Sequence, residues 1–128
     1  MAGCQSYQWA AQYPNMVKAI LPFCASSKTS IHNHVFLEGV KAALTADKNW
    51  NKGNYKRQPV AGLRAFGRVY AGWAFSQNFY REKLFKKLGY KNSEELLNDW
   101  AEDHAKNWDA NNLLSKLKTW QLNDISRG

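Results

Sequence analysis

The sequence predicts a mostly α-helical fold, in which one helix and one strand precede about five further helices. Apolar residues recur at helical spacing along most of the chain, only one short run is strand-like, and capping residues precede the later helices. The 128 residues are enough for one packed domain. Their 45% hydrophobic and 14% aromatic content argues against a disordered chain.

The chain is expected to begin with a helix over residues 2–13, in which Tyr7, Ala10 and Ala11 share one face. The run 17–23 is apolar and bounded by turn residues, which is typical of a buried parallel strand. A single strand leaves its backbone N–H and C=O groups without partners. We therefore expect residues 17–23 to be the weak point of the isolated chain.

Each of the five later helices has a start signal, either a side chain that can cap the first turn or a proline at the first position. A loop rich in Asn and Lys, residues 47–59, separates the first two of them. The expected start signals are Ser30 for a helix over 31–46, Pro59 for the next, Ser76 for a helix over 77–88 that Gly89 ends, Asn92 with Glu95 for the fourth, and Asp109 for the fifth.

The chain is basic, with a formal net charge of +8. Basic and aromatic residues alternate in the segments 48–57 and 81–87, a combination that single-stranded nucleic-acid-binding proteins use. No recognised nucleic-acid-binding motif accompanies them, so nucleic-acid binding is an alternative and not the preferred function. No apolar run approaches the roughly 20 residues of a membrane-spanning helix, and we expect no membrane partner.

The cysteines and histidines predict neither a disulfide framework nor a metal site. Two cysteines, Cys4 and Cys24, are too few for a secreted disulfide scaffold and are expected as buried thiols in the reducing cytoplasm. His32 and His34 are two residues apart, so they point about 200° apart on a helix and not to one metal ion.

Arg68 is the strongest candidate for ligand contact that the residues alone suggest. It lies one turn after Arg64 in a segment otherwise rich in Ala, Gly and aromatic residues. An arginine on such a face is costly to bury unless it meets an anion. Arg68 is therefore expected either to contact a carboxylate or to extend into solvent.

Three stretches, in this order and spacing, carry a family resemblance: MAGCQSYQWAAQYPNMVKAILPFCASSKTSIHNHVFLEGVKAAL, GLRAFGRVYAGWAFSQNFYRE and WDANNLLSKLKTWQLNDIS. They resemble the homoserine O-acetyltransferase family of α/β-hydrolase-fold enzymes over essentially the whole chain. The resemblance implies that residues 1–27 are a partial α/β-hydrolase core, consisting of the helix after the nucleophile elbow and one strand. Residues 28–128 would then be the helical lid.

The same resemblance implies where the catalytic groups lie. Met1 matches the residue after the nucleophilic serine, so its backbone N–H would serve the oxyanion hole in a longer chain. The serine, acid and base of the triad match no residue of this chain, which is therefore expected to be inactive alone. Cys4 and Ser6 are the only nucleophile types near the elbow, and neither has a base in position.

Substrate contacts are implied for two lid residues. Arg68 matches the lid arginine that contacts the substrate's carboxylate, and Phe75 stands where the family has a tyrosine. Phe75 has no hydroxyl, which implies an acyl acceptor other than homoserine. The family implies acetyl-CoA as cosubstrate with no tightly bound cofactor, acetyl transfer to a hydroxyl through a serine acyl-enzyme, methionine biosynthesis, and homodimers formed through lid helices. Hydrolysis instead of transfer, and a non-catalytic helical interaction module, are the alternatives.

Overall fold

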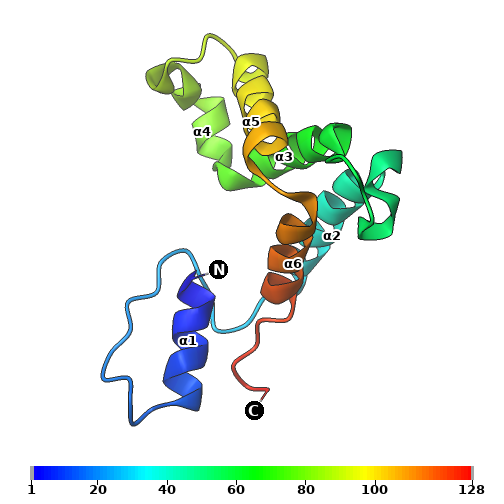
Figure 1. The fold of residues 1–128 in the computed structure, drawn as a ribbon. Helices are drawn as coiled ribbons and strands as arrows, with labels where there is room; N and C mark the ends of the chain where they lie inside the picture. The colour runs from blue at the N-terminus through cyan, green and yellow to red at the C-terminus, as the bar shows by residue number, and fades with distance from the viewer. Residues whose placement is uncertain (1, 128) are drawn as a thin grey trace. The chain divides into compact units, whose positions relative to one another are not determined.

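The computed structural model describes residues 2–127, which are mostly helical and contain no strand (Figure 1). The mostly helical class predicted from the sequence is confirmed. The elements in chain order are α1 (Ala2–Gln12), α2 (Ile31–Thr45), the 3-10 helix η1 (Lys48–Gly53), α3 (Val60–Ala74), α4 (Gln77–Arg81), the 3-10 helix η2 (Leu84–Leu88), α5 (Ser93–Asn107) and α6 (Ala110–Gln121).

The chain divides into two compact units. The first contains α1, the segment that follows it up to Leu37, and the C-terminal segment from Leu114 onward. The second runs from Glu38 to Leu113 and holds η1, α3, α4, η2 and α5. The two compact units do not correspond to the division predicted from the family resemblance, which separates a core over residues 1–27 from a lid over residues 28–128. That division concerns the α/β-hydrolase fold as a whole and stays a prediction.

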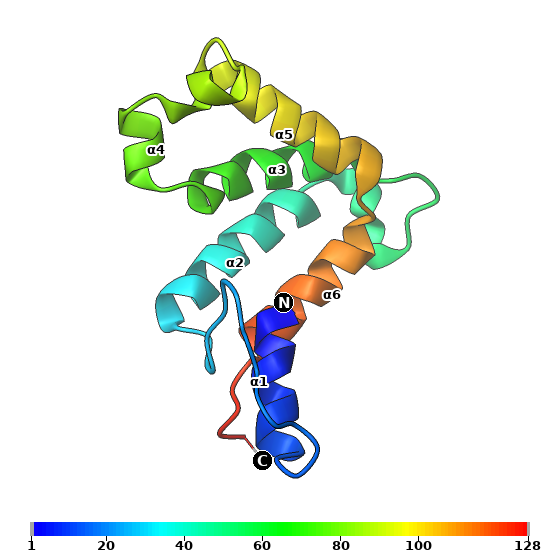
Figure 2. The same ribbon diagram turned by 90° about the vertical axis from the view of Figure 1, so that its left-hand side faces the viewer.

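In the first unit, α1 packs closely against the segment that follows it (Figure 2). A Cβ atom on Gly3 would lie 2.5 Å from Ala25 Cβ and 2.7 Å from the Phe23 carbonyl oxygen, so only glycine fits this contact. Cys4, the next residue, is buried. Small residues at the start of α1 therefore serve close packing.

The strand predicted at residues 17–23 is not formed. These residues have irregular backbone, and the side chains of Leu21 and Phe23 are 77% and 73% exposed. A strand needs a neighbour to pair its N–H and C=O groups, and residues 2–127 offer none. Cys24 is a second correction, because its thiol is exposed and not buried.

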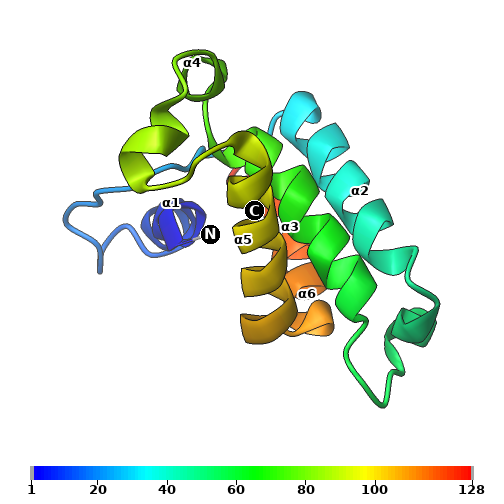
Figure 3. The same ribbon diagram turned by 90° about the horizontal axis from the view of Figure 1, so that it is seen from above.

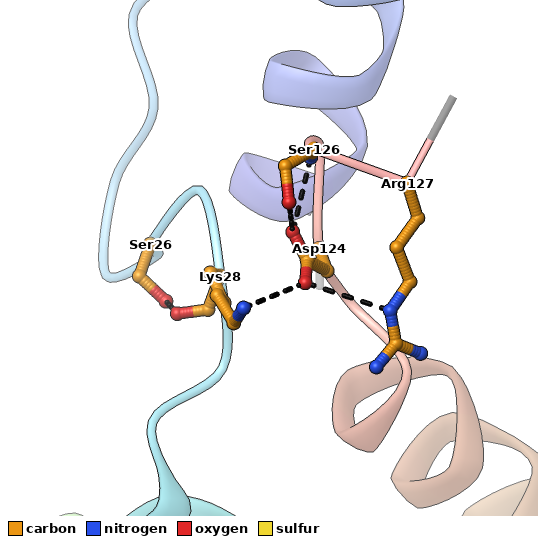
Figure 4. Close-up of polar contacts among 5 residues, drawn as sticks. All are labelled: Ser26, Lys28, Asp124, Ser126 and Arg127. Atoms are coloured by element: carbon orange, nitrogen blue, oxygen red, sulfur yellow. Dashed lines mark hydrogen bonds and ion pairs between the residues drawn. The ribbon is translucent and has the colours of Figure 1, made fainter.

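The first unit also joins two segments that are far apart in the sequence, here called the neck: residues 26–29 and 123–127. The Thr29 N–H donates to the Asn123 carbonyl at 2.9 Å, and the Ile125 N–H donates to the Ser27 carbonyl at 3.0 Å. Between these bonds, Lys28 and Asp124 form an isolated antiparallel bridge. Their side chains also form an ion pair, which Figure 4 draws as a dashed line. The neck ties the entry of α2 to the end of α6.

In the second unit, α3 lies against α5 (Figure 3). A Cβ atom on Gly67 would lie 2.5 Å from the backbone carbonyl oxygen of Trp100, so the two helices approach to backbone contact. This close approach fixes which side chains face each other across the pair. The buried apolar side chains of the unit include Val40, Leu44, Leu63, Phe66, Ala71, Phe85 and Leu96.

The four predicted side-chain caps are confirmed, but one of the predicted helices is divided in two. The side chains of Ser30, Ser76, Asn92 and Asp109 each accept a backbone N–H three residues on, at 3.1, 3.1, 2.9 and 2.9 Å. The single helix predicted over 77–88 is wrong: α4 and η2 are separated around Lys83, whose φ of 53° cannot continue a right-handed helix. Gly89 ends η2 in the left-handed conformation, as expected for a C-cap.

Candidate functional site

Arg68 extends from α3 onto the facing side of α5. Its guanidinium donates to Glu94 Oε1 at 2.8 Å, to Glu94 Oε2 at 3.0 Å and to Asn98 Oδ1 at 2.7 Å. The guanidinium therefore contacts a carboxylate, but one that belongs to this chain. Its side chain remains 38% exposed, so solutes can reach this pair.

A second arginine repeats the contact one turn earlier on α3. Arg64 binds Glu102 through two hydrogen bonds, Nε to Oε1 at 2.7 Å and the terminal nitrogen to Oε2 at 3.2 Å. The Arg64 guanidinium lowers the pKa of the Glu102 carboxyl, chiefly through this hydrogen bonding. We call this row the ionic edge of the α3–α5 pair; it consists of Arg64, Arg68, Glu94, Asn98 and Glu102.

Phe75 caps the C-terminal end of α3 and enters an aromatic cluster. Its ring stacks on Phe79 with centroids 4.2 Å apart, and it meets Trp100 edge-on at 5.3 Å. Phe75 is the residue directly after α3 and has an extended backbone, seven residues on from Arg68. The structure thus gives Phe75 packing contacts, while its expected role beside a substrate stays a prediction.

The other edge of the α3–α5 pair carries an open hollow of about 420 Å³. Sequence reasoning missed this hollow, because its lining comes from two helices whose facing sides only the fold reveals. The available signal was the spacing of Trp100, His104 and Trp108, which recur every four residues and therefore share a face. The hollow is lined by Tyr70, Asp99, Trp100, Asp103, His104 and Trp108.

The residues near the elbow position offer no activated nucleophile. Met1, the expected oxyanion-hole residue, lies outside the described residues. The Ser6 hydroxyl donates to the Ala2 carbonyl at 3.0 Å, and the Cys4 side chain is buried. The Ser6 hydroxyl is therefore engaged within α1, and the Cys4 thiol is shielded from solvent.

Residues 2–127 contain neither a candidate metal site nor a candidate membrane span. No three or more His, Cys, Asp or Glu side chains gather there in a way that could hold a metal ion. No helix in this part of the chain is long and apolar enough to cross a membrane.

Relatives in sequence are esterases and acetyltransferases, although no family model matches the chain. A probable esterase of Corynebacterium glutamicum is 30% identical over 99% of this chain, and the ethyl acetate hydrolase of Pseudomonas veronii is 29% identical over 99%. The homoserine O-acetyltransferase of Rhodospirillum rubrum is 32% identical over 98%. The chain spans 37% of the length of the two esterases and 36% of the acetyltransferase.

Solved structures that superpose on this chain are also those of esterases. An acetylester hydrolase from Corynebacterium glutamicum superposes with a TM-score of 0.91 at 28% identity, over 98% of this chain and 36% of its own. The acetyl esterase MekB superposes with a TM-score of 0.92 at 28% identity, over 98% of this chain and 37% of its own.

The chain is therefore homologous to part of a group of acyl-transfer enzymes. Its homologues are homoserine O-acetyltransferases and acetyl esterases of the α/β-hydrolase family. The family resemblance predicted from the three sequence stretches is confirmed.

Proposed function

We propose that the chain supplies the helix after the nucleophile elbow and the lid of a serine enzyme that cleaves acetyl esters. The superposition on the acetyl esterase MekB over 98% of the chain carries this proposal, because nearly every element has a counterpart in an enzyme of that activity. In this arrangement, no member of the catalytic triad lies within residues 2–127. The isolated chain is then inactive.

In the proposed enzyme, a serine hydroxyl attacks the acyl carbonyl and a base takes its proton. The bond from serine oxygen to acyl carbon forms, the bond to the leaving alcohol or thiol breaks, and the leaving group takes the proton. The oxygen of water or of a hydroxyl acceptor then bonds to the acyl carbon, the bond to the serine oxygen breaks, and the base returns a proton to the serine. Acetyl-CoA as the acyl donor, a role in methionine biosynthesis and a cytoplasmic location stay predictions from the family.

The ionic edge favours an acceptor without a carboxylate. A substrate carboxylate that used Arg68 would compete with Glu94, which already accepts two hydrogen bonds from the guanidinium. Phe75 adds no hydroxyl to hold such a substrate. Water or a simple alcohol meets neither obstacle, which supports ester hydrolysis over acetyl transfer to homoserine.

The proposal is tested by exchange of the matching segment. The segment of MekB that superposes on this chain is replaced by residues 2–127, and hydrolysis of ethyl acetate, acetyl-CoA and acetylhomoserine is measured. We expect ethyl acetate turnover by the folded chimera and none by the chain alone. A chimera that folds and binds a serine-directed phosphonate, but turns over none of the three, would contradict the proposal.

A second candidate, a helical interaction module, is favoured by one observation. Ile31 and Val35 lie one turn apart on α2 and are 85% and 63% exposed. Apolar side chains placed together on one helix face are suited to self-association. This role is compatible with the lid, since Ile31 and Val35 are not among the residues of the ionic edge.

A further inference from the structure

The hollow on the edge of the α3–α5 pair opposite to the ionic edge has no role in the proposed ester cleavage. Tyr70 follows Arg68 by two residues, which turns its side chain by about 200° around α3. The hollow and the ionic edge therefore open on different sides of the helix pair. The hollow has a volume of about 420 Å³, which is sufficient for a small organic molecule.

A row of stacked rings forms the wall of this hollow. Trp100 and His104 have ring centroids 5.8 Å apart with planes inclined by 26°, and His104 and Trp108 follow at 6.0 Å and 23°. Tyr70 adds a fourth ring from α3, 6.1 Å from Trp100. Rings contributed by both helices therefore lie next to one another along the wall.

The wall is held in place by backbone contacts. His104 Nδ1 is 2.7 Å from the Trp100 carbonyl oxygen, which fixes the orientation of the imidazole. Gly67 lets α3 approach α5 to backbone contact beside the same two residues. Rings fixed in this way need little reordering when a ligand binds.

Two carboxylates complete the lining. Asn107 Nδ2 donates to Asp103 Oδ1 at 2.8 Å, and Trp108 Nε1 donates to Asp103 Oδ2 at 3.1 Å. These bonds, with the one from Asn107 first, lower the pKa of the Asp103 carboxyl. Asp99 accepts the Tyr90 hydroxyl through Oδ2 at 2.7 Å. Negative charge thus collects here in a chain whose formal net charge is +8.

We propose that this hollow binds a small organic cation of the alkylammonium class. The negative face of an aromatic ring attracts a cation, most strongly when the ring is Trp. The carboxylates of Asp99 and Asp103 add direct charge attraction and repel phosphate or carboxylate ligands. A neutral ligand of the same shape would gain only the apolar contact.

The test uses choline and its neutral isostere 3,3-dimethyl-1-butanol with the full chain. The indole N–H signals of Trp100 and Trp108 are followed by ¹H–¹⁵N NMR and assigned through Trp100→Phe and Trp108→Phe. We expect saturable millimolar choline shifts at these two signals, weaker shifts with the alcohol, and none at Trp9, which lies in the first unit.

Carboxylate variants separate charge from shape. Asp99→Asn and Asp103→Asn should each weaken choline binding about threefold or more, while Glu82→Gln, outside the hollow, should leave it unchanged. Folding of each variant is checked by circular dichroism. Equal binding of the neutral isostere, equal shifts at Trp9, or unchanged affinity in both folded asparagine variants would each overturn the proposal.

Discussion

Lys28 Nζ lies 3.0 Å from Asp124 Oδ2 and joins the two segments of the neck. Only 6% of the Asp124 side chain is exposed, although it carries a charge. The Ser126 hydroxyl donates to its other oxygen at 2.6 Å, and Arg127 Nε lies 3.5 Å from Oδ2 (Figure 4). Asp124 is therefore the common acceptor that connects the end of α6 to the entry of α2.

The neck should lose stability in acid. Hydrogen bonds from Ser126, then Lys28, lower the pKa of Asp124 from 3.8 to about 2. A carboxyl whose folded pKa is lower than its unfolded pKa stabilises the fold above the unfolded value and loses this contribution as pH falls through the folded value. We expect Asp124→Asn to lower the unfolding midpoint in urea at pH 6 and to have a smaller effect at pH 2.

The control for this experiment is Glu38→Gln, which removes an exposed carboxylate paired with Lys41 outside the neck. It should change the midpoint little at either pH, since exposed pairs contribute little. Equal destabilisation by Asp124→Asn at pH 6 and pH 2 would show that the charge of Asp124 is not what stabilises the neck.

Contact between α3 and α5 should depend on Gly67. In Gly67→Ala the new methyl group would lie 2.5 Å from the Trp100 carbonyl oxygen, so the helices must separate. We expect a loss of about 1–3 kcal/mol in free energy of unfolding, as for other overpacked cores. Gly72→Ala is the matched control on the same helix: its Cβ meets nothing within 4 Å, and it should gain up to about 1 kcal/mol. Urea titration compares the two, and a neutral Gly67→Ala would contradict the contact.

Local features of this chain were predictable from the sequence, and features set by distant partners were not. The caps are local, because the side chains of Ser30, Asn92 and Asp109 each accept the backbone N–H of the residue three positions later. A few neighbouring residues are therefore enough to predict where these helices begin. The run 17–23 has the residue pattern of a strand, but a strand forms only beside another strand that pairs with its backbone. The residues next to the run in the sequence do not show whether such a strand is present.

The candidate sites divide in the same way. The residues alone indicated that Arg68 would meet a carboxylate or solvent, but Glu94 and Asn98 as its partners required the packing of α3 on α5. The aromatic hollow was missed for the same reason, because Tyr70 comes from one helix and Trp100 from another. The position of Phe75 among other rings likewise follows from tertiary contacts.

Release of Arg68 from Glu94 should change which acceptors the proposed enzyme accepts. In the MekB chimera, Glu94→Gln removes the charge that occupies the Arg68 guanidinium. We expect a lower KM for acetylhomoserine, whose carboxylate can then bind Arg68, and an unchanged KM for ethyl acetate. The stability cost should stay below about 1 kcal/mol, because the pair is exposed.

The matched control for that variant is Glu102→Gln, which frees Arg64 on the same edge. If both variants lower the KM for acetylhomoserine equally, the effect reflects general charge and not a specific Arg68 contact. No change in either would argue that Arg68 does not meet the substrate.

Self-association should depend on the exposed apolar residues of α2. In the double variant Ile31→Glu, Val35→Glu, two carboxylates replace the side chains that are 85% and 63% exposed, and an apolar interface cannot bury them without cost. We expect the unmodified chain to elute as a dimer in size-exclusion chromatography with light scattering, and the double variant as a monomer with unchanged helicity. Met16→Glu, which places one such carboxylate on an exposed residue outside α2, should leave the dimer intact. A dimer that persists in the double variant would place the interface elsewhere, and a monomeric unmodified chain would exclude self-association of this chain at that concentration.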